Sequence, residues 1–484
     1  MKAFNRPLLV LCAAVSVSLL LYALIFLPVA NLLTLHQTPL LDLQKMSAFD
    51  PALAPKLGVG FIALFVCYAA GWWAAQRTHT RLAWGIVLAG AFLACLLLLF
   101  QYPYDAADVF DYIIDGRIQS YWGGNPFFNI PDEFKADPFL AYAGWVYYPA
   151  AYGPLWQMLS AFLTFFTGES VIVNVLSFKV LAGLFMWGTA FLVWRLLRKT
   201  APERAFAGLW LVLWNPLVLY ETLGMAHNDM VMVFWITAAA FCLAHRRTTL
   251  AVLALMLGAL IKFIPLLLVP VAVLIGWQQQ VTRGARFRYL VQAGLLSLLV
   301  AAACYAPYWQ GLETLGAVRR SQMYTTSLPA LGFVLLSPLM GEGMAGSLIS
   351  SLAGTLTFLF AMWEAHNAMH SSQPWRAFAV ASLRILLFYL VLACPWYQQW
   401  YPLWLVGLAA LLPAGSLPSL ALSLGALTLS KPLVFAPLIL WPQPLLPKLQ
   451  RELALSLGVM LPAWVFLVWQ ALRSKWNLFF WNDQ

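Results

Sequence analysis

Long apolar runs recur along almost the whole of this 484-residue chain, and they constrain its fold more than any other feature. Hydrophobic residues make up 62% of the sequence and charged residues only 10%. A soluble protein of this composition would need an apolar core larger than single soluble domains sustain. Runs of about 20 apolar residues are instead long enough to cross the hydrocarbon layer of a membrane as helices. The sequence therefore predicts an all-α polytopic membrane protein.

The apolar runs predict a bundle of about 12–14 membrane-spanning helices and a single membrane domain over residues 1–484. The run at 153–168 is short, and a span there would place the basic cluster around Arg195 and Lys199 outside. We therefore expect a helix in the outer interface at that position, and we expect interfacial helices in the outer loops as well. The other runs are predicted to span near residues 7–33, 56–76, 82–101, 170–196, 205–222, 229–244, 248–262, 264–278, 289–307, 345–363, 377–394, 400–413, 418–438 and 453–472.

Basic residues lie mostly in short connections between the apolar runs, and they give the chain a formal net charge of +10. Lys and Arg are enriched in the cytoplasmic connections of membrane proteins. With the N-terminus in the cytoplasm, this bias puts the short basic connections inside and most acidic residues outside. The basic residues form no stripe with interleaved aromatic residues, which argues against a nucleic-acid partner. We expect a multi-pass protein of the inner or plasma membrane, with the lipid bilayer as its immediate partner.

Two connections on the predicted outer side are long, at residues 102–152 and 308–344. The outer connections are rich in aromatic residues and proline, whereas the inner ones are short and basic. A plain membrane anchor needs no such loops, and long ordered loops tend to carry function. The active site is therefore expected on the extracytoplasmic face, with 102–152 as the catalytic loop.

Four aspartates fall within eleven residues of the first outer loop, namely Asp105, Asp108, Asp111 and Asp115. On a helix the last three share one face, at the edge of the membrane. A carboxylate that is close to other carboxylates and partly desolvated has a raised pKa, which suits a general base. The alternative is a solvated acidic helix start without a catalytic role.

A metal site is an option that the sequence does not favour. Asp105 and Asp108 are the candidate ligands, because carboxylate oxygens suit Mg²⁺ or Mn²⁺. No second acidic cluster of similar density accompanies them, so we expect no metal and no required cofactor. All six cysteines lie in or at the ends of apolar segments without paired spacing, which predicts neither a disulfide framework nor a cysteine metal cluster.

A second polar group lies at the predicted outer junction of two spans, where Glu221, His227, Asn228 and Asp229 follow one another closely. Polar groups on apolar segments are energetically expensive and usually serve function. Helix capping by Asn228 or Asp229 is the structural alternative. For His227 the sequence leaves function and structure evenly balanced.

Basic residues at the predicted outer face form a third group. Lys262 either extends to lipid headgroups or offers a positive charge to a phosphate. Arg319 and Arg320 lie in the second outer loop, against the positive-inside trend, so either a bound anion or anionic lipid accounts for them.

An aromatic stretch at 395–404, PWYQQWYPLW, includes Trp396 and Tyr397. Aromatic faces at an outer surface suit either sugar stacking or the aromatic belt of a membrane protein, and we favour the belt.

The order of these motifs resembles that of the GT-C glycosyltransferases, the polytopic enzymes that take a sugar from a polyprenyl-phosphate carrier. More narrowly, it is similar to the polyprenol-phosphate-mannose-dependent α-1,6-mannosyltransferases. The ordered set covers about 300 residues, and its members are DVFDY (108–112) with Gly116, GGNPF (123–127), YGPL (152–155), NPLVLYETLGMAHND (215–229), IKFIPLLLVP (261–270) and PWYQQWY (395–401).

The resemblance implies a GT-C-like bundle and an inverting transfer of a sugar, with mannose implied, from a polyprenyl-phosphate donor to a cell-envelope glycan or glycolipid. Asp108 best matches the general base, and its neighbours Asp105 and Asp111 stay open. The donor phosphate would be bound by Lys262, Arg319 and Arg320. Candidate substrate-binding residues are His227, Asn228, Asp229, Tyr152, Trp396 and Tyr397.

The main alternative is a polytopic lipid or sugar transporter or flippase. Transporters often show paired repeats and broken helices at the midplane of the membrane, whereas the polar groups here gather on one face. Lys179 and Arg384 lie within apolar runs and are the exceptions, with an ion pair or snorkelling as their structural explanation. A polymerase or ligase with a pyrophosphate-linked donor is a third interpretation, and it favours more arginines in the outer loops.

Overall fold

The computed structural model describes residues 6–40, 53–315 and 323–413, together with a few positions between 450 and 465. Over these residues the chain forms helices and no strand, apart from two isolated bridges, Asn31 with Gln101 and Thr325 with Trp396. The prediction of an all-α polytopic membrane protein is confirmed.

Seven helices in the described part are long and apolar enough to cross a membrane: Arg6–Val29, Lys56–Ala75, Arg81–Leu99, Val171–Thr200, Arg283–Tyr308, Glu342–Ala368 and Pro374–Ala393. An eighth is added if the bent pair Pro202–Leu213 and Pro216–Gly224 is one span. Four apolar helices are shorter, at Asp229–Ala244, Thr248–Ala259, Ile264–Gln278 and Leu328–Met340. The count of 12–14 spans stays a prediction, since the segment 418–438 and most of 453–472 lie outside the described residues.

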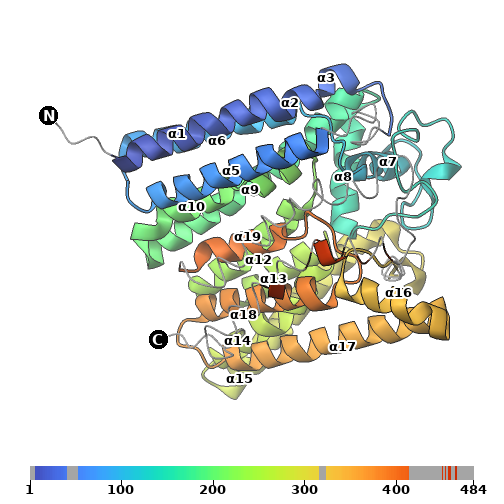
Figure 1. Ribbon diagram of the computed structural model, residues 1–484. Coiled ribbons are helices and arrows are strands. Elements are labelled where there is room, and N and C mark those ends of the chain that lie inside the picture. The colour runs from blue at the N-terminus through green and yellow to red at the C-terminus, as the bar shows by residue number, and fades with distance from the viewer. Residues whose placement is uncertain are drawn as a thin grey trace.

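The long helices run side by side in two groups (Figure 1). The first group contains α1 (Arg6–Leu21), α5 (Leu53–Ala75), α6 (Arg81–Leu99), α9 (Val171–Thr200) and α10 (Ala205–Leu213). Close approach of α5 and α10 depends on Gly71, because the Trp210 ring occupies the space that a side chain there would need. The Trp210 indole N–H also donates to the carbonyl of Tyr68 at 3.0 Å.

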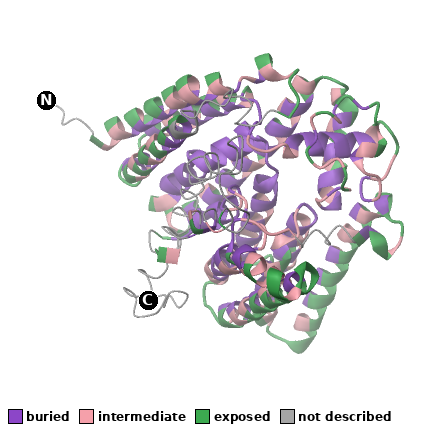
Figure 2. Ribbon diagram, turned by 45° about the vertical axis from the view of Figure 1, so that its right-hand side comes forward, coloured by how far each residue is buried: buried purple, intermediate pink, exposed green. Residues whose placement is uncertain are grey.

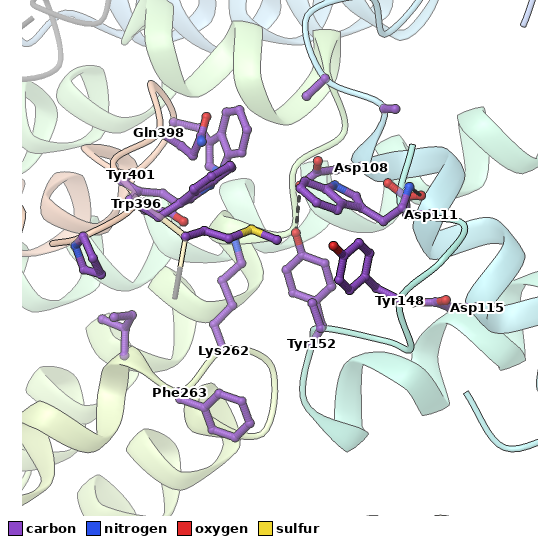
Figure 3. Close-up of a pocket in the computed structure, with 18 of the residues that line it drawn as sticks. Asp108, Asp111, Asp115, Tyr148, Tyr152, Lys262, Phe263, Trp396, Gln398 and Tyr401 are labelled. Carbon is purple, nitrogen blue, oxygen red and sulfur yellow. Dashed lines mark hydrogen bonds between the residues drawn. The ribbon is translucent and has the colours of Figure 1, made fainter. Parts of the chain in front are cut away.

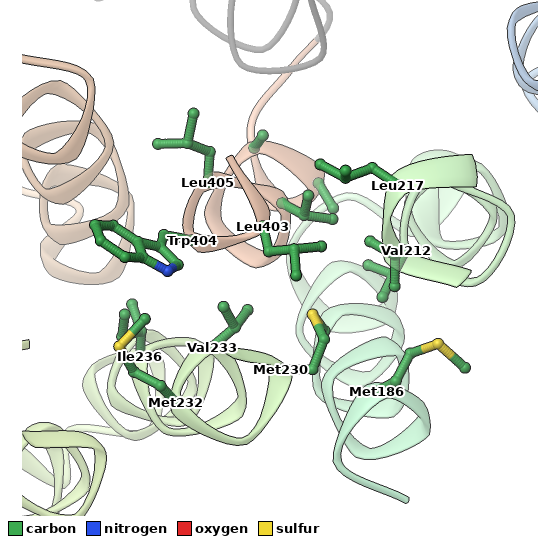
Figure 4. Packing of buried hydrophobic residues seen from close by; sticks show 14 of the residues in the cluster. Met186, Val212, Leu217, Met230, Met232, Val233, Ile236, Leu403, Trp404 and Leu405 are labelled. Carbon is green, nitrogen blue, oxygen red and sulfur yellow. The ribbon is translucent and has the colours of Figure 1, made fainter. Parts of the chain in front are cut away.

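The second group includes a short buried helix (Leu403–Leu411) that also contacts α9 and α10 of the first group. Its members are α12 (Asp229–Ala244), α13 (Thr248–Ala259), α14 (Val269–Gln278), α15 (Arg283–Tyr305), α17 (Glu342–Ala368), α18 (Pro374–Phe388) and α19 (Leu403–Leu411). Every residue of α19 is buried. Figure 4 shows Leu403 and Trp404 of α19 beside Met230 and Val233 of α12. An entirely apolar and entirely buried helix is expected at the centre of a large bundle.

Exposed residues lie along the peripheral helices of the bundle (Figure 2), and many of them are large and apolar. On α15, Leu298 and Leu299 are exposed, and on α17 Phe358 and Leu359 are exposed. Such faces suit lipid, which is as apolar as leucine.

Two charged side chains within the described spans, Lys179 and Arg384, are bonded to backbone or paired. The Lys179 ammonium donates to the carbonyls of Leu98 and Leu99 at 3.1 and 3.2 Å and also to that of Gln101. Arg384 lies 3.5 Å from Glu364, so the internal ion pair accounts for it. These contacts give both residues a structural explanation.

Short helices lie at the end of the bundle that is far from the described N-terminus (Figure 1). They are α7 (Asp108–Ser120), α8 (Pro154–Thr167) and α16 (Leu328–Met340). The short run predicted at 153–168 forms α8, which lies across the ends of the long helices in Figure 1. Gly116 lets α7 contact α8 closely, since a side chain there would lie 2.6 Å from the Ser160 carbonyl oxygen. The sequence predicted interfacial helices in the outer loops without giving their bounds, and α16 occupies part of the 308–344 loop.

Candidate active site

A cavity of about 540 Å³ lies at the end of the bundle that carries α7 (Figure 3). Its walls come mainly from the segments 105–115, 145–152, 262–264 and 395–404, with Pro131, Met323 and Tyr389 in addition. A volume of this size is typical of small-molecule sites. The cavity therefore joins three of the polar or aromatic groups that the sequence separates by up to about 300 residues.

The four aspartates of the first outer loop all line this cavity. Asp108 and Asp111 lie in the first turn of α7, and Asp115 follows one turn later. The predicted shared face is thus confirmed. Acidic side chains in a first helical turn are stabilised by the helix dipole, and the Gln399 side-chain amide donates to the carboxylate of Asp105.

Asp111 is held by backbone. Its Oδ1 accepts hydrogen bonds from the N–H groups of Gly144 and Trp145 at 2.9 and 3.0 Å. Burial, followed by the nearby charge of Asp108, raises the pKa of Asp111 well above its ordinary value, although the two backbone bonds oppose the shift. Asp111 therefore ties the 144–145 loop to α7.

Asp108 is only partly buried and faces Tyr152. The Tyr152 hydroxyl donates to Asp108 Oδ2 at 2.7 Å, the contact drawn as a dashed line in Figure 3. The Tyr112 hydroxyl lies farther away, at 3.5 Å from the same oxygen. One carboxylate in the cavity thus has a tyrosine as its closest hydrogen-bond partner.

Tyr152 is positioned by the glycine that follows it. The Gly153 N–H donates to the Ile261 carbonyl at 2.9 Å, and the Leu155 N–H donates to the Leu260 carbonyl at 3.0 Å. A side chain on Gly153 would collide with the Leu260 carbonyl. These contacts bring Tyr152 beside Lys262, whose Nζ lies 5.3 Å from the centre of the tyrosine ring. A cation over an aromatic face is a favourable arrangement.

Lys262 lines the cavity, and its ammonium group is held by the buried carboxylate of Asp229. Its Nζ lies 2.6 Å from Asp229 Oδ2. The other oxygen of Asp229 accepts the indole N–H of Trp404 at 2.6 Å. Asp229 is fully buried, whereas 11% of the Lys262 side chain stays exposed. Asp229 therefore does not line the cavity, but both of its partners do.

His227 and Asn228 lie one layer behind the cavity wall and are fully buried. The His227 Nδ1 is 3.0 Å from a Glu221 carboxylate oxygen. Its ring stacks on Trp400, with centroids 4.0 Å apart. Trp400 lines the cavity, so His227 is separated from it by an indole ring. Substrate binding by His227, Asn228 and Asp229 stays a prediction. In the structure all three residues are buried and none of them lines the cavity.

The aromatic stretch at 395–404 divides between the cavity and the core. Trp396 lines the cavity, whereas Tyr397 is buried with its ring 6.2 Å from that of Tyr401. The other two candidates for the donor phosphate, Arg319 and Arg320, lie outside the described residues.

A metal site finds no counterpart in the described ranges, where no group of three or more His, Cys, Asp or Glu is arranged to hold a metal ion. Asp105 is bonded to Gln399 and Asp108 to Tyr152. The predicted absence of a required cofactor stays a prediction.

Several lining residues were not singled out by sequence reasoning. Tyr401 and Trp404 belong to the aromatic stretch that was noted, but alternation along that stretch did not show which rings face inward. Tyr148 follows the acidic segment without a motif of its own. Tyr389 lies in a π-helical turn, η8 (Tyr389–Ala393), and such turns are frequent at functional sites. No sequence signal points to Met323.

The geometry combines a carboxylate and an ammonium group in one cavity, with Tyr152 in contact with both. Such a site can accept a proton at Asp108 and stabilise negative charge at Lys262. It also has aromatic surface for an apolar or sugar group.

Comparison with known proteins gives a family match. Over residues 10–278, more than half of its length, the chain matches the family described as "Alpha-(1->6)-mannopyranosyltransferase, N-terminal domain". This match includes Asp108, Tyr152 and Lys262, and it ends before the 395–404 segment. No solved structure matches the chain.

Three curated relatives are similar over parts of their length. Alpha-(1->6)-mannopyranosyltransferase A of Mycobacterium tuberculosis is 25% identical over 34% of this chain and 32% of the relative. The protein of the same name from Corynebacterium glutamicum is 23% identical over 40% of this chain and 39% of the relative. Alpha-(1->6)-mannopyranosyltransferase B of Corynebacterium glutamicum is 23% identical over 66% of this chain and 57% of the relative. The matches thus span from about a third to somewhat over half of the relatives.

Proposed function

Because the chain belongs to the α-(1→6)-mannopyranosyltransferase family whose N-terminal domain it matches, we propose that it is a mannosyltransferase of the GT-C type. In this proposal it moves mannose from a polyprenyl-phosphate carrier to a hydroxyl of a cell-envelope glycan or glycolipid. The reaction takes place at the extracytoplasmic face of the cell membrane.

One observation supports the proposal above all others: Asp108 and Lys262 line the same cavity, and Tyr152 contacts both. The two groups come from different outer junctions of the bundle. A base and a phosphate-binding cation are the parts that transfer from a lipid phosphate requires.

The leaving group determines what Lys262 does. When the bond between the anomeric carbon and the phosphate oxygen breaks, the phosphate gains negative charge, so no acid is needed to protonate it. An ammonium group beside that oxygen stabilises the developing charge, and it does so strongly in a cavity that excludes water. Asp229 and Trp404 hold Lys262 in place for this role.

Asp108 fits the base better than its two neighbours do. Asp111 is buried and held by two backbone N–H groups, and its raised pKa favours the neutral form. Asp105 is bonded to the Gln399 amide. Asp108 keeps a partly exposed carboxylate whose close partner is one tyrosine hydroxyl.

The reaction is then a single displacement. The acceptor oxygen forms a bond to the anomeric carbon while its proton passes to Asp108, and the electron pair of the broken bond leaves with the lipid phosphate. Attack from the side opposite the phosphate inverts the configuration of that carbon. The pair of carboxylates used by glycoside hydrolases is not needed.

The carrier enters where the cavity is least polar. Phe263 and Ile264 line it next to Lys262, and Met323 and Tyr389 add further apolar surface. The polyprenyl tail can lie against such residues while its phosphate reaches the ammonium group. A site at the end of a helix bundle is suited to a donor that stays in the membrane.

The test uses purified protein in detergent with radiolabelled polyprenyl-phosphate mannose and mannose-containing acceptors. Wild-type protein should transfer label, and Asp108→Asn should lower the rate by about 10²- to 10⁴-fold, the usual contribution of general base catalysis. Asp132→Asn is the matched control, because Asp132 lies in the same loop outside the cavity lining. Full activity of Asp108→Asn would remove this residue as the base. No transfer from any donor would overturn the proposal in favour of a transporter.

A further inference from the structure

Three aromatic rings form a row along one wall of the cavity. The ring centroid of Trp145 lies 5.8 Å from that of Tyr148 and 6.3 Å from that of Trp396. All three residues line the cavity, and they come from two loops that are about 250 residues apart in sequence. We refer to Trp145, Tyr148 and Trp396 as the aromatic row.

Carboxylates continue along α7 in the same part of the cavity. At roughly 1.5 Å of rise per residue, Asp115 lies about 10 Å beyond Asp108 along the helix. In Figure 3, Lys262 and Trp396 lie on one side of Tyr152, whereas Tyr148 and Asp115 lie on the other. The cavity therefore extends past Asp108, away from the group assigned to the phosphate.

Asp111 fixes the distance between the aromatic row and α7. Its Oδ1 binds the N–H groups of Gly144 and Trp145, which carry the start of the row. Its Oδ2 is buried and accepts no hydrogen bond from the described residues. A buried polar atom without a partner is uncommon in native proteins, and this oxygen can accept a hydrogen bond from a hydroxyl of a bound sugar.

We infer that the aromatic row and the α7 carboxylates Asp111 and Asp115 form the acceptor subsite, and that this subsite binds a neutral pyranose. The inference rests on the proposed function, since the donor phosphate must occupy the Lys262 side. The base must touch the attacking hydroxyl, so the acceptor extends from Asp108 toward Asp115.

The chemistry of the two walls selects the ligand class. Aromatic faces pack against the apolar C–H face of a sugar ring. Carboxylate oxygens accept hydrogen bonds from its hydroxyl groups. The other carboxylates that line the cavity, Asp105, Asp108 and Asp115, also repel an acidic sugar, because like charges in a partly desolvated site are costly. A neutral hexose fits both walls, whereas a uronic acid or a phosphorylated sugar does not.

Tyr148 offers the sharpest test because its neighbour provides a matched control. Both Tyr147 and Tyr148 are surface tyrosines, 69% and 45% exposed, but only Tyr148 lines the cavity. The probe is a fluorescently tagged, α-(1→6)-linked mannose trisaccharide, used as acceptor with polyprenyl-phosphate mannose as donor. Tyr148→Ala should raise the acceptor KM about tenfold, as expected for the loss of one aromatic contact. The donor KM should stay within about twofold, and Tyr147→Ala should match wild type.

A second variant and a second probe keep the inference falsifiable. Asp115→Asn should likewise raise the acceptor KM and leave the donor KM unchanged, with an unaltered melting temperature as the check on folding. A trisaccharide that ends in a uronic acid should be a poor acceptor for wild type. An unchanged acceptor KM in Tyr148→Ala, or equal use of the uronic acid, would overturn the acceptor subsite while wild-type transfer upholds the proposed function. Absence of wild-type transfer to any acceptor would instead overturn the proposed function itself.

Discussion

Two ion pairs at the end of the bundle that carries α7 combine the same kinds of charged group but differ in their exposure. Arg117 and Asp137 lie 2.8 Å apart, with side chains that are 1% and 0% exposed. Lys262 and Asp229 lie 2.6 Å apart, with side chains that are 11% and 0% exposed. In the first pair both side chains are buried. In the second pair the carboxylate is buried and the cation lines the cavity.

The surroundings of each pair fit this difference. Asp137 also accepts the Trp122 indole N–H at 2.8 Å and the Phe139 backbone N–H at 3.0 Å. Arg117 donates to the Gly168 carbonyl at 3.0 Å, which ties α7 to the end of α8. The first pair therefore holds the loop together, whereas the second pair leaves the ammonium group of Lys262 available to a ligand. We therefore assign a structural role to the Arg117–Asp137 pair and a catalytic role to the Lys262–Asp229 pair.

The largest effect is expected from removing the cation of the buried Arg117–Asp137 ion pair. Arg117→Met should lower the free energy of unfolding by about 3–5 kcal/mol, because it leaves the Asp137 charge buried without its partner. Thermal unfolding in detergent measures this loss. The control is Lys135→Met, whose partner Asp132 is solvent-accessible; it should change stability by at most about 1 kcal/mol. Equal effects of the two variants would contradict a structural role for the Arg117 pair.

Lys262→Gln should affect catalysis instead of folding. The amide can still donate to Asp229, so the fold should be retained, but the positive charge at the phosphate is lost. Transfer should fall by about 10²- to 10³-fold, the usual cost of removing one group that stabilises transition-state charge. Initial rates with radiolabelled donor provide the measurement, and Lys199→Gln at the far end of α9 serves as control. If Lys262→Gln lowered the melting temperature as much as Arg117→Met does, the Lys262 pair would also be structural, and the proposed difference between the pairs would be wrong.

Asp229→Asn should have a smaller effect that distinguishes positioning from substrate binding. The variant keeps an acceptor for Trp404 but no longer holds Lys262 by charge. We expect kcat to fall about ten- to a hundredfold, as misplacement of a catalytic group does, without a rise in the donor KM. A raised donor KM with unchanged kcat would show that Asp229 binds substrate directly, as the sequence predicted.

The smallest effect concerns pH and Asp111. The folded state binds the Asp111 proton more tightly than the unfolded chain does, because its pKa is raised. The stability from this group is therefore complete below the ordinary pKa of aspartate and is lost as the pH rises through the raised pKa. Asp111→Asn mimics the neutral form, so its melting temperature relative to wild type should increase with pH. A difference that decreases with rising pH would contradict the assignment.

The sequence predicted the class of fold and the shared face of the aspartates because both depend on local periodicity. Apolar runs fix where helices lie, and spacings of three and four place Asp108, Asp111 and Asp115 together. The position of Lys262 between two apolar runs marked it as a candidate, and the family motifs added Tyr152. These features need no knowledge of how distant segments meet.

Contacts between segments that are distant in the sequence could not be predicted from local periodicity or from motifs. The Asp229 carboxylate points at Lys262 and not into the cavity, and only the packing of α12 against α13 makes this pair. His227 is covered by Trp400, a residue more than 170 positions later. The aromatic row depends on Asp111, whose backbone contacts place Trp145. Each of these features arises from tertiary structure.

The central claim is that Asp108 and Lys262 act from opposite sides on one transferred mannose, in a single displacement. The most direct test is the anomeric configuration of the product. Wild-type protein would be supplied with polyprenyl-phosphate mannose of known configuration and an isotope label at the anomeric carbon, and the new linkage examined by NMR. We predict that the configuration at this carbon is inverted. Retention would require a covalent intermediate or attack from the phosphate side, and it would contradict the account.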